Sequence, residues 1–505
     1  MRMRSGTAVA GVAALAVAGM ALTAAFEPVW AHGPTRQKVR ESIEINAAPA
    51  KVWAVIGNFQ DMSWLPPVTK TEGEKGNEIG ATRRLTLTGG ATVDEELYKF
   101  DAAAMTYSYR ITAVDVKVLP LTNYSSTLTV TPSADGKGAT LRVGRRVLPR
   151  LSQQRSAAGA ERRGRQDCGE RALQGRPRGT EEEDRERKLT VRVLVLAALA
   201  ASLACLGSAS AEEAFVTNQL SDDLMVVDLA TARAVATIPI GGKPAGVAVS
   251  GDGRFAYVTS PDAKAVTVVD AATRQVTGRI EVGGGPLGIT LAPDGRTVYV
   301  ADWYAAAVRV IDAASRSVTA SIAVGASPSG LAVTPDGKLL LSADRDDDSV
   351  SVVDTAKRAR KAVIKVGTRP FGVTIDTDGK RAYTANVGSN DVSVIDIATG
   401  AEIGRVPVGM RPYAVALAQG RGFVTDQYGG TVSVFDLATL KPVKRINVGD
   451  YPEGINATAD GKRIIVACWE SNTLDIIDTT ELKVIGEVKT GDGPRAFGAF
   501  LRRTE

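Results

Sequence analysis

The chain has 505 residues, which is enough for more than one domain, and its composition argues against several classes of protein. Residues 142–188 carry 14 Lys or Arg against 8 Asp or Glu, so the net charge of +5 is local and predicts no nucleic-acid binding. The sequence has one histidine, His32, which argues against a Ser-His-Asp hydrolase or a His-rich zinc site. The three cysteines have no metal or redox spacing and predict no disulfide framework: Cys168, Cys205 and Cys468.

Residues 1–31 have the features of a secretory signal peptide. Arg2 and Arg4 precede an apolar run over residues 8–26, and the Val-Trp-Ala of residues 29–31 fits a cleavage site. A mature chain would then begin at His32. We therefore expect the protein to be exported to the periplasm.

Residues 191–211 form a second segment of this kind inside the chain. An apolar run from Val191 to Leu206 follows two basic residues and ends in small residues. It predicts an internal signal peptide or a membrane anchor, although it is short for a membrane span. Cys205 follows Ala204 as in a lipoprotein acylation site, but the residues before that pair fit the pattern poorly.

The segment between these parts, residues 142–190, is rich in Arg, Gln, Gly and Glu and has almost no apolar periodicity. By composition it reads as a disordered linker. With a suitable choice among synonymous codons, a shifted reading frame can encode an aromatic strand, a Pro/Asn turn and an amphipathic helix. The shifted frame can then read a stop codon at residues 189–190, and the codon of Val191 can be a bacterial start. We therefore hypothesise two reading frames joined by a frameshift near Leu141.

Residues 32–141 predict a small α+β domain. Residues 39–46 alternate as a strand, residues 48–56 place apolar side chains on one helical face, and a loop follows. Further strands are expected at residues 82–88, 92–100, 105–112, 125–131 and 139–143. The order is strand, helix and antiparallel meander.

The run INAAPAKVWAVIGNFQDMSWLP and the strands after it resemble the helix-grip fold of the START/polyketide-cyclase (SRPBCC) superfamily. With a signal peptide, the resemblance narrows to periplasmic MxaD-type accessory proteins of methanol oxidation. That fold needs a C-terminal helix, which this chain lacks in frame, so we expect an uncovered apolar face and an unstable domain. The resemblance also implies a cavity, lined by Trp53, Trp64, Tyr107 and Tyr109; plain core packing is the alternative.

Residues 212–505 contain a repeat of about 42 residues. Two hydrophobic residues followed by Asp recur seven times, and a G-x-x-P motif keeps the same spacing. Most units also have an Asp-Gly pair between two β-type runs, which is a strong hairpin signal. The repeated aspartates, which we interpret as turn-capping residues, are Asp228, Asp270, Asp312, Asp354, Asp396, Asp436 and Asp478.

Each unit predicts four short strands, which makes it one blade of a β-propeller. In the second unit these are residues 287–291, 297–301, 307–312 and 318–324. Residues 214–218 supply a second strand and residues 494–500 a first strand with no successor, so the chain ends complete one shared blade. The fold class is therefore mainly β, a seven-bladed propeller preceded by a helix-grip domain without its C-terminal helix.

The strands FVTN, YVTS, YVAD, YTAN and FVTD resemble the namesake strand of YVTN repeats. The propeller is similar to those associated with PQQ-dependent alcohol catabolism. Loops after the second strands and the G-x-x-P loops should share one face. They offer aromatic and arginine residues suited to a protein partner or an anion, with ordinary loop packing as the alternative: Trp303, Tyr304, Arg369, Arg411, Tyr413, Tyr428 and Trp469.

Two further features have simple interpretations. The acidic turn at Asp344 and residues 346–348 could hold calcium, but its spacing is not that of an EF-hand, and we favour a solvated charged turn. Cys468 is expected to be a buried strand residue. We predict no metal, no cofactor and no catalytic residue.

The resemblances imply a non-catalytic periplasmic binding or scaffold protein, accessory to PQQ-dependent methanol or alcohol oxidation. A quinoprotein dehydrogenase or its cytochrome would be the partner, and the propeller would be monomeric. Two alternatives stay open: a cell-envelope interaction propeller and a lactonase-like hydrolase. The hydrolase is less favoured because Val, Ala, Ile and Gly dominate the first strands, where metal ligands would be needed.

Overall fold

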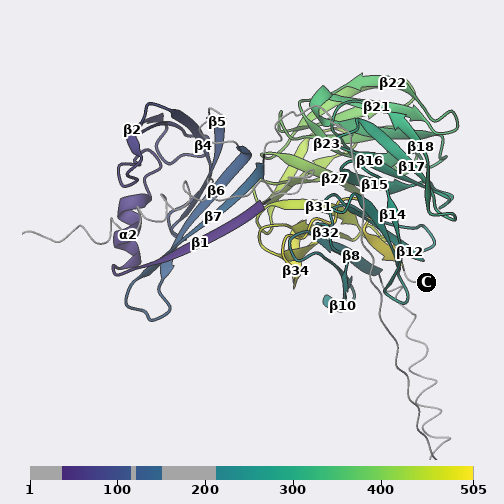
Figure 1. The fold of residues 1–505 in the computed structure, drawn as a ribbon. Helices are drawn as coiled ribbons and strands as arrows, with labels where there is room; N and C mark the ends of the chain where they lie inside the picture. The colour runs from purple at the N-terminus through teal and green to yellow at the C-terminus, as the bar shows by residue number, and fades with distance from the viewer. Residues whose placement is uncertain (1–36, 115–120, 150–211, 504–505) are drawn as a thin grey trace, which may run out of the picture. The chain divides into compact units, whose positions relative to one another are not determined.

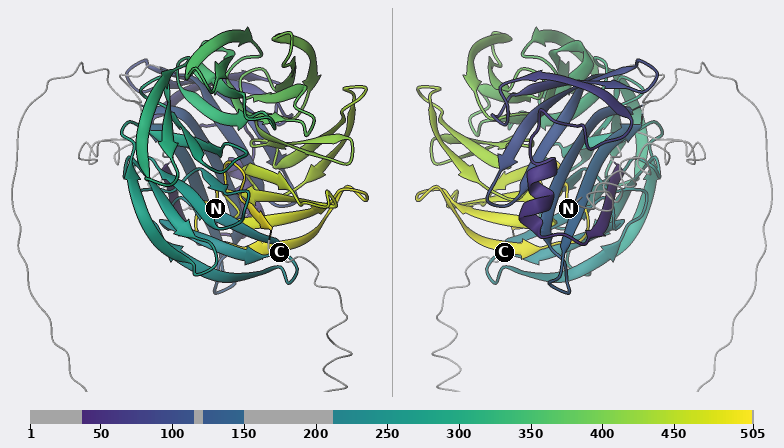
Figure 2. Two further views of the ribbon diagram at one scale, coloured as in Figure 1. Left: turned by 90° about the vertical axis from the view of Figure 1, so that its right-hand side faces the viewer. Right: turned by 90° about the vertical axis from the view of Figure 1, so that its left-hand side faces the viewer.

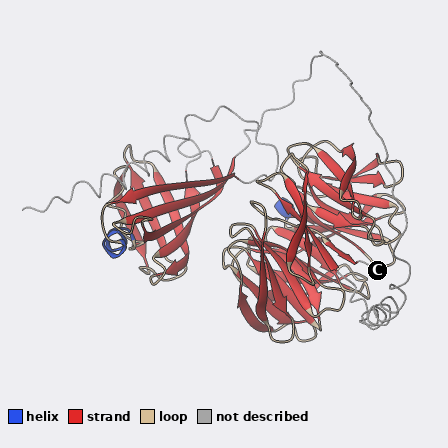
Figure 3. Cartoon of the chain, turned by 90° about the horizontal axis from the view of Figure 1, so that it is seen from below, coloured by secondary structure: helices blue, strands red, loops and turns tan. Residues whose placement is uncertain are grey.

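The computed structural model describes residues 37–114, 121–149 and 212–503 (Figure 1). Both predicted signal segments, His32, Cys168, Cys205 and most of the segment 142–190 lie outside the described residues. Strands make up nearly all of the regular structure (Figure 3). Within the described ranges, no helix has the length and apolar character needed to cross a membrane.

The N-terminal part is one antiparallel sheet with a short helix, in the predicted element order. The sheet order is β1-β7-β6-β5-β4-β3-β2, so the first strand pairs with the last. Its elements are β1 (Gln37–Ile45), α2 (Pro49–Ile56), β2 (Val68–Glu74), β3 (Thr82–Leu87), β4 (Thr92–Asp101), β5 (Thr106–Val114), β6 (Leu121–Pro132) and β7 (Ala139–Pro149).

Helix α2 begins and ends where its sequence dictates. Pro49 opens it, since proline has no N–H to leave unpaired and its φ already suits the first turn. At the other end, the Gly57 N–H donates to the Trp53 carbonyl, and a Cβ at Gly57 would lie 2.6 Å from the Trp53 ring. Val52 and Ile56 are buried, and α2 packs against β6 and β7.

Two strands differ from the sequence prediction. Strand β2 was not predicted, because VTKTEGE has little apolar alternation and its side chains are mostly exposed. Strand β7 continues to Pro149, beyond residue 141, where the sequence placed the end of the domain. Its added residues pair with both β1 and β6, and Arg145 forms an ion pair with Glu41 at 2.8 Å.

Residues 212–503 form seven four-stranded antiparallel sheets, which confirms the seven-bladed propeller. The sheets follow one another around a ring (Figure 2). The strands are, sheet by sheet, β8 (Glu212–Asn218), β9 (Asp223–Asp228), β10 (Arg233–Pro239) and β35 (Leu501–Arg503); β11 (Val247–Val249), β12 (Phe255–Ser260), β13 (Ala265–Asp270) and β14 (Gln275–Glu281); β15 (Pro286–Leu291), β16 (Thr297–Asp302), β17 (Ala307–Asp312) and β18 (Ser317–Ala323); β19 (Pro328–Val333), β20 (Leu339–Asp344), β21 (Ser349–Asp354) and β22 (Ala359–Lys365); β23 (Pro370–Ile375), β24 (Arg381–Asn386), β25 (Asp391–Asp396) and β26 (Ala401–Pro407); β27 (Pro412–Ala418), β28 (Arg421–Asp426), β29 (Thr431–Asp436) and β30 (Pro442–Asn447); β31 (Pro452–Ala457), β32 (Arg463–Cys468), β33 (Thr473–Asp478) and β34 (Lys483–Lys489).

The repeated turn residues act as the sequence predicts. Asp228 accepts hydrogen bonds from the backbone N–H groups of Ala230 and Thr231 at 2.9 and 2.8 Å, and the other blades repeat the arrangement. These backbone hydrogen bonds lower the pKa of Asp228. Where one unit lacks Asp-Gly, Gln419 and Gly420 both have positive φ, at 49° and 70°, and supply an equivalent hairpin turn.

The two ends of the propeller meet in one sheet, as predicted. Strand β35 pairs with β8, and the Phe215 N–H donates to the Phe500 carbonyl at 2.9 Å. The regular strand β35 begins just after residues 494–500, the stretch that was predicted to form it. Residues 494–500 make backbone hydrogen bonds, but in an irregular pattern. Gly498 explains this, because its φ of 129° interrupts the extended backbone.

Candidate functional site

The two predicted loop sets do lie together. In several blades the residue after the second strand donates its N–H to the carbonyl just before the proline of the G-x-x-P loop. Trp303 donates to Gly285 at 3.0 Å, and Trp469 donates to Tyr451 at 3.0 Å. Loop residues of both sets therefore share one rim of the propeller.

Four aromatic and arginine side chains pack into what we call the rim cluster: Arg411, Tyr428, Tyr451 and Trp469. The ring of Tyr451 lies 5.6 Å from that of Tyr428 and 5.8 Å from that of Trp469. The Arg411 guanidinium lies 5.1 Å from the centre of the Tyr428 ring, a cation–π distance. All four side chains are buried in the structure.

A second aromatic group packs among the first strands. Tyr413 and Phe371 follow the prolines of successive units, and their rings are 4.2 Å apart. Phe497 lies 5.2 Å from Phe371, and Trp303 lies 6.3 Å from it. Tyr413 is 1% exposed, so this predicted site residue belongs to the core.

A buried polar chain joins the two groups. The Arg411 Nε donates to Gln427 Oε1 at 2.8 Å, and Gln427 Nε2 donates to Glu453 Oε1 at 2.9 Å. Arg495 donates through Nε to Glu453 Oε2 at 2.8 Å and through Nη2 to the Tyr413 hydroxyl. Gln427, Glu453 and Arg495 were not among the residues predicted for a site.

The structure therefore separates the predicted surface residues. Arg411, Tyr428 and Trp469 come together, and Tyr413 and Trp303 belong to the aromatic packing behind them. Tyr304 is 42% exposed and Arg369 is exposed, and neither joins the rim cluster. Three of the seven residues therefore lie together, and their role in binding a ligand or partner stays a prediction.

Three of the four predicted cavity residues of the N-terminal domain, Trp64, Tyr107 and Tyr109, belong to its core cluster, and the partly buried Trp53 packs against that cluster. Tyr107 is fully buried, and its ring lies 6.1 Å from those of both Trp53 and Tyr109. Trp64 is 7% exposed, and its indole N–H donates to the Asp61 carbonyl at 3.1 Å. These contacts show packing, and a ligand cavity there stays a prediction.

The same core holds an ion pair that was not predicted. Arg83 donates through Nε to Glu95 at 2.6 Å, and both residues are buried. The guanidinium also lies 4.1 Å from the centre of the Phe59 ring. Burial raises the pKa of Glu95, and Arg83 opposes that rise.

The carboxylates of the acidic turn are used in local hydrogen bonds. Asp346 accepts from the Ser327 hydroxyl at 2.5 Å, and Asp347 accepts from the Ala326 N–H at 2.8 Å. Asp344 is buried between Ser342 and Ser351, and burial raises its pKa to about 6. In the described part of the chain, no group of three or more His, Cys, Asp or Glu is arranged to hold a metal ion.

Cys468 ends strand β32 and is fully buried, as expected. Burial raises the pKa of its thiol well above the ordinary value. A buried thiol that stays protonated is a poor nucleophile, so Cys468 is not suited to covalent catalysis.

Arg369 and Arg411 offer a matched pair of substitutions. Both precede the proline of a G-x-x-P loop and have left-handed backbone, with φ of 56° and 57°. Glycine adopts a positive φ without strain, so the backbone effect of the substitution is the same at both sites. We expect Arg369→Gly to change the free energy of unfolding by less than about 0.5 kcal/mol. Arg411→Gly should lower it by about 1–3 kcal/mol, because Gln427 and Tyr428 lose a buried charged partner.

Urea denaturation of the two variants and the parent chain measures this difference. Equal effects at the two positions would show that the buried contacts of Arg411 do not stabilise the propeller.

Two family models match the chain, one over its N-terminal part and one over its propeller. Residues 36–175 match the family "Polyketide cyclase / dehydrase and lipid transport". Residues 181–292 and 332–500, which are more than half of the sequence, match the YNCE-like beta-propeller family. The chain belongs to the YNCE-like beta-propeller family. It carries an SRPBCC-type domain before the propeller, as its N-terminal strands predicted.

Solved structures support the fold. A Bacteroides fragilis protein described as a candidate 6-phosphogluconolactonase is 18% identical, with a TM-score of 0.51, covering 59% of this chain and 99% of its own. A functionally unknown protein from Desulfotomaculum acetoxidans is 17% identical, with a TM-score of 0.50, covering 56% and 99%. At these identities the likeness concerns the fold alone. No curated protein sequence matches the chain.

Proposed function

We propose that this protein is a periplasmic binding or scaffold protein, and that it assists PQQ-dependent methanol or alcohol oxidation without catalysing a reaction. The rim cluster is the observation that carries the binding role. Its tyrosines, tryptophan and arginine are the side chains that most often anchor protein interfaces. They are held in place by packing against one another and by the Arg411–Gln427 hydrogen bond.

The link to alcohol oxidation rests on the sequence resemblances of both domains. A quinoprotein dehydrogenase or its cytochrome is the proposed partner. The test is affinity capture from periplasm with the full chain as bait, beside an Arg411→Gly variant shown to be folded. Capture of a dehydrogenase or cytochrome by the parent chain alone supports the proposal, and repeated capture of neither contradicts it.

A hydrolase is the second candidate, because one structural neighbour is described as a candidate 6-phosphogluconolactonase. The buried Arg83–Glu95 pair is a separate place for chemistry in the N-terminal domain. Turnover of lactone substrates by the purified chain, lost in Glu95→Gln, would favour catalysis there. Turnover that survives Glu95→Gln would favour the propeller.

We also propose that the two domains are encoded by adjacent reading frames. Strand β7 reaches Pro149 and the family match reaches residue 175, so the fold of β7 itself does not require a frame break at Leu141. Resequencing the DNA across residues 135–195 tests the proposal, and the mass of the mature protein shows whether one or two polypeptides exist. An intact frame with a single product would contradict it.

A further inference from the structure

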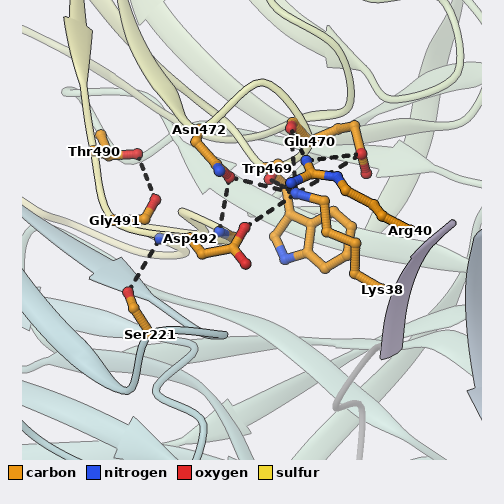
Figure 4. Close-up of polar contacts among 10 residues, drawn as sticks. Lys38, Arg40, Ser221, Trp469, Glu470, Asn472, Thr490, Gly491 and Asp492 are labelled. Carbon is orange, nitrogen blue, oxygen red and sulfur yellow. Dashed lines mark hydrogen bonds and ion pairs between the residues drawn. The ribbon is translucent and has the colours of Figure 1, made fainter. Parts of the chain in front are cut away.

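The ammonium group of Lys38, on strand β1, lies in a cage made by the propeller (Figure 4). Its Nζ lies 3.2 Å from the Glu470 carbonyl, 3.4 Å from Asn472 Oδ1 and 3.2 Å from Asp492 Oδ1. It also lies 4.9 Å from the centre of the Trp469 ring. The Lys38 side chain is 3% exposed, so the cage replaces nearly all of its water.

The propeller's own hydrogen bonds hold the cage in shape. Asn472 Oδ1 accepts from the Gly493 N–H at 3.0 Å, and the Asp492 N–H donates to the Ser221 hydroxyl at 3.1 Å (Figure 4). Glu470 adds a carboxylate 3.8 Å from the Lys38 ammonium. A buried ammonium needs acceptors and opposite charge of this kind, since burial alone lowers the pKa of Lys38.

The rim cluster receives a second side chain of the N-terminal domain. Tyr98, on strand β4, stacks on Tyr428 with ring centres 4.6 Å apart and planes at 15°. It thereby joins the apolar cluster of Tyr428, Tyr451 and Trp469. The centre of a protein interface is usually made of buried aromatic residues that pack on one another in this way.

The charges around these two anchors are complementary. The N-terminal domain contributes cations, with Arg40 3.2 Å from Glu470 and Lys99 2.6 Å from Asp450. The propeller contributes carboxylates. Opposite charges at a rim steer association and select the partner more than they add affinity.

We propose that the rim cluster and the ammonium cage together are a docking surface for the SRPBCC-type domain, with Tyr98 and Lys38 as its anchors. Docking covers Tyr428 and Trp469, so it competes with any external partner of that surface. The proposal holds for one polypeptide or two. It stands whether or not a quinoprotein is the external partner, because it rests on these contacts alone.

Hydrogen exchange in the intact full chain tests the docking first. Tyr98→Ala and Lys38→Met should each speed amide exchange in peptides covering residues 426–430 and 468–473 by at least threefold. Lys51→Met is the matched control, because Lys51 is an exposed lysine of α2, and it should change nothing in those peptides. Unchanged exchange in both anchor variants, with the fold intact by circular dichroism, would overturn the proposal.

A second experiment measures affinity. A protease site inserted between residues 150 and 211 of the full chain allows the folded protein to be cut. The two pieces should still elute together, and Tyr98→Ala should raise their dissociation constant at least tenfold. Lys99→Asp should weaken association, and adding Asp450→Lys should restore it, which loss of folding does not do. Folded pieces that separate at micromolar concentration, or a charge swap without rescue, would contradict docking.

Discussion

Glu453→Gln is expected to lower the free energy of unfolding of the propeller by about 3–5 kcal/mol, because it leaves the Arg495 charge buried without its counterion. Arg495 and Glu453 side chains are 1% and 0% exposed, and their Nε and Oε2 atoms are 2.8 Å apart. Arg495 lies in the closing stretch of the chain and Glu453 in β31, so the pair also joins the chain end to the ring.

Urea denaturation at pH 7 measures this effect, with two controls. Glu487→Gln removes one partner of the exposed Lys489–Glu487 pair and should change stability by less than about 1 kcal/mol. The double variant Glu453→Met/Arg495→Met removes both buried charges and should recover most of the loss. If Glu453→Gln is no worse than Glu487→Gln, the buried pair does not hold the ring closed.

The repeat predicted the blades because each unit encodes its own turns. Asp-Gly hairpins and the turn-capping aspartates depend on residues two or three apart in sequence, and a single chain displays them directly. Closure of the ring could be predicted by counting strands, because the first unit lacks the strand that the last unit supplies. The irregular bond pattern at Gly498 depends on packing against Val247, which lies far away in sequence.

The buried polar chain had a sequence signal that was not used. Glu453 and Arg495 each follow the proline of a G-x-x-P motif in successive units, so a ring places them side by side. Opposite charges at equivalent positions of adjacent blades predict an ion pair. Likewise, Arg83 pairs directly opposite Glu95 in the β3–β4 hairpin, whose register is centred on Gly89. Counting outward from Gly89-Gly90 as a two-residue turn would instead have set Arg83 opposite Glu96.

The rim cluster was only partly predictable. Loop aromatics of seven blades look alike in sequence, and the features that bring Tyr428, Tyr451 and Trp469 together are contacts between neighbouring blades. Nothing in the local sequence of Tyr304 or Arg369 marks them as exposed and separate. The partners of Lys38 and Tyr98 lie more than 300 residues away, beyond the reach of any local pattern.

Asp344→Asn is expected to stabilise the protein increasingly as the pH rises from 4 to 8. Burial raises the pKa of Asp344 to about 6 from an ordinary 3.8, with nearby Asp347 acting in the same direction. The folded state therefore favours the protonated carboxyl. Its stabilising contribution is complete below pH 3.8 and is lost as the pH rises through about 6. At pH 8 the ionised group costs up to about 3 kcal/mol, which asparagine avoids.

The neighbouring blade shows that asparagine fits this position. Asn386 stands 42 residues after Asp344, and its Nδ2 donates to the Ser393 hydroxyl at 2.8 Å, where Ser351 meets Asp344. Asp336→Asn is a control of opposite sign, because hydrogen bonds from the Thr334 hydroxyl and the Lys338 N–H lower the pKa of Asp336 to about 2. Asp336 therefore stabilises the fold above pH 3.8 and loses that effect as the pH falls through 2. Urea midpoints measured at pH 4, 6 and 8 should rise further above those of the parent for Asp344→Asn as the pH increases. The midpoints of Asp336→Asn should lie below those of the parent. An Asp344→Asn curve parallel to that of the parent would show that the Asp344 carboxyl ionises without cost.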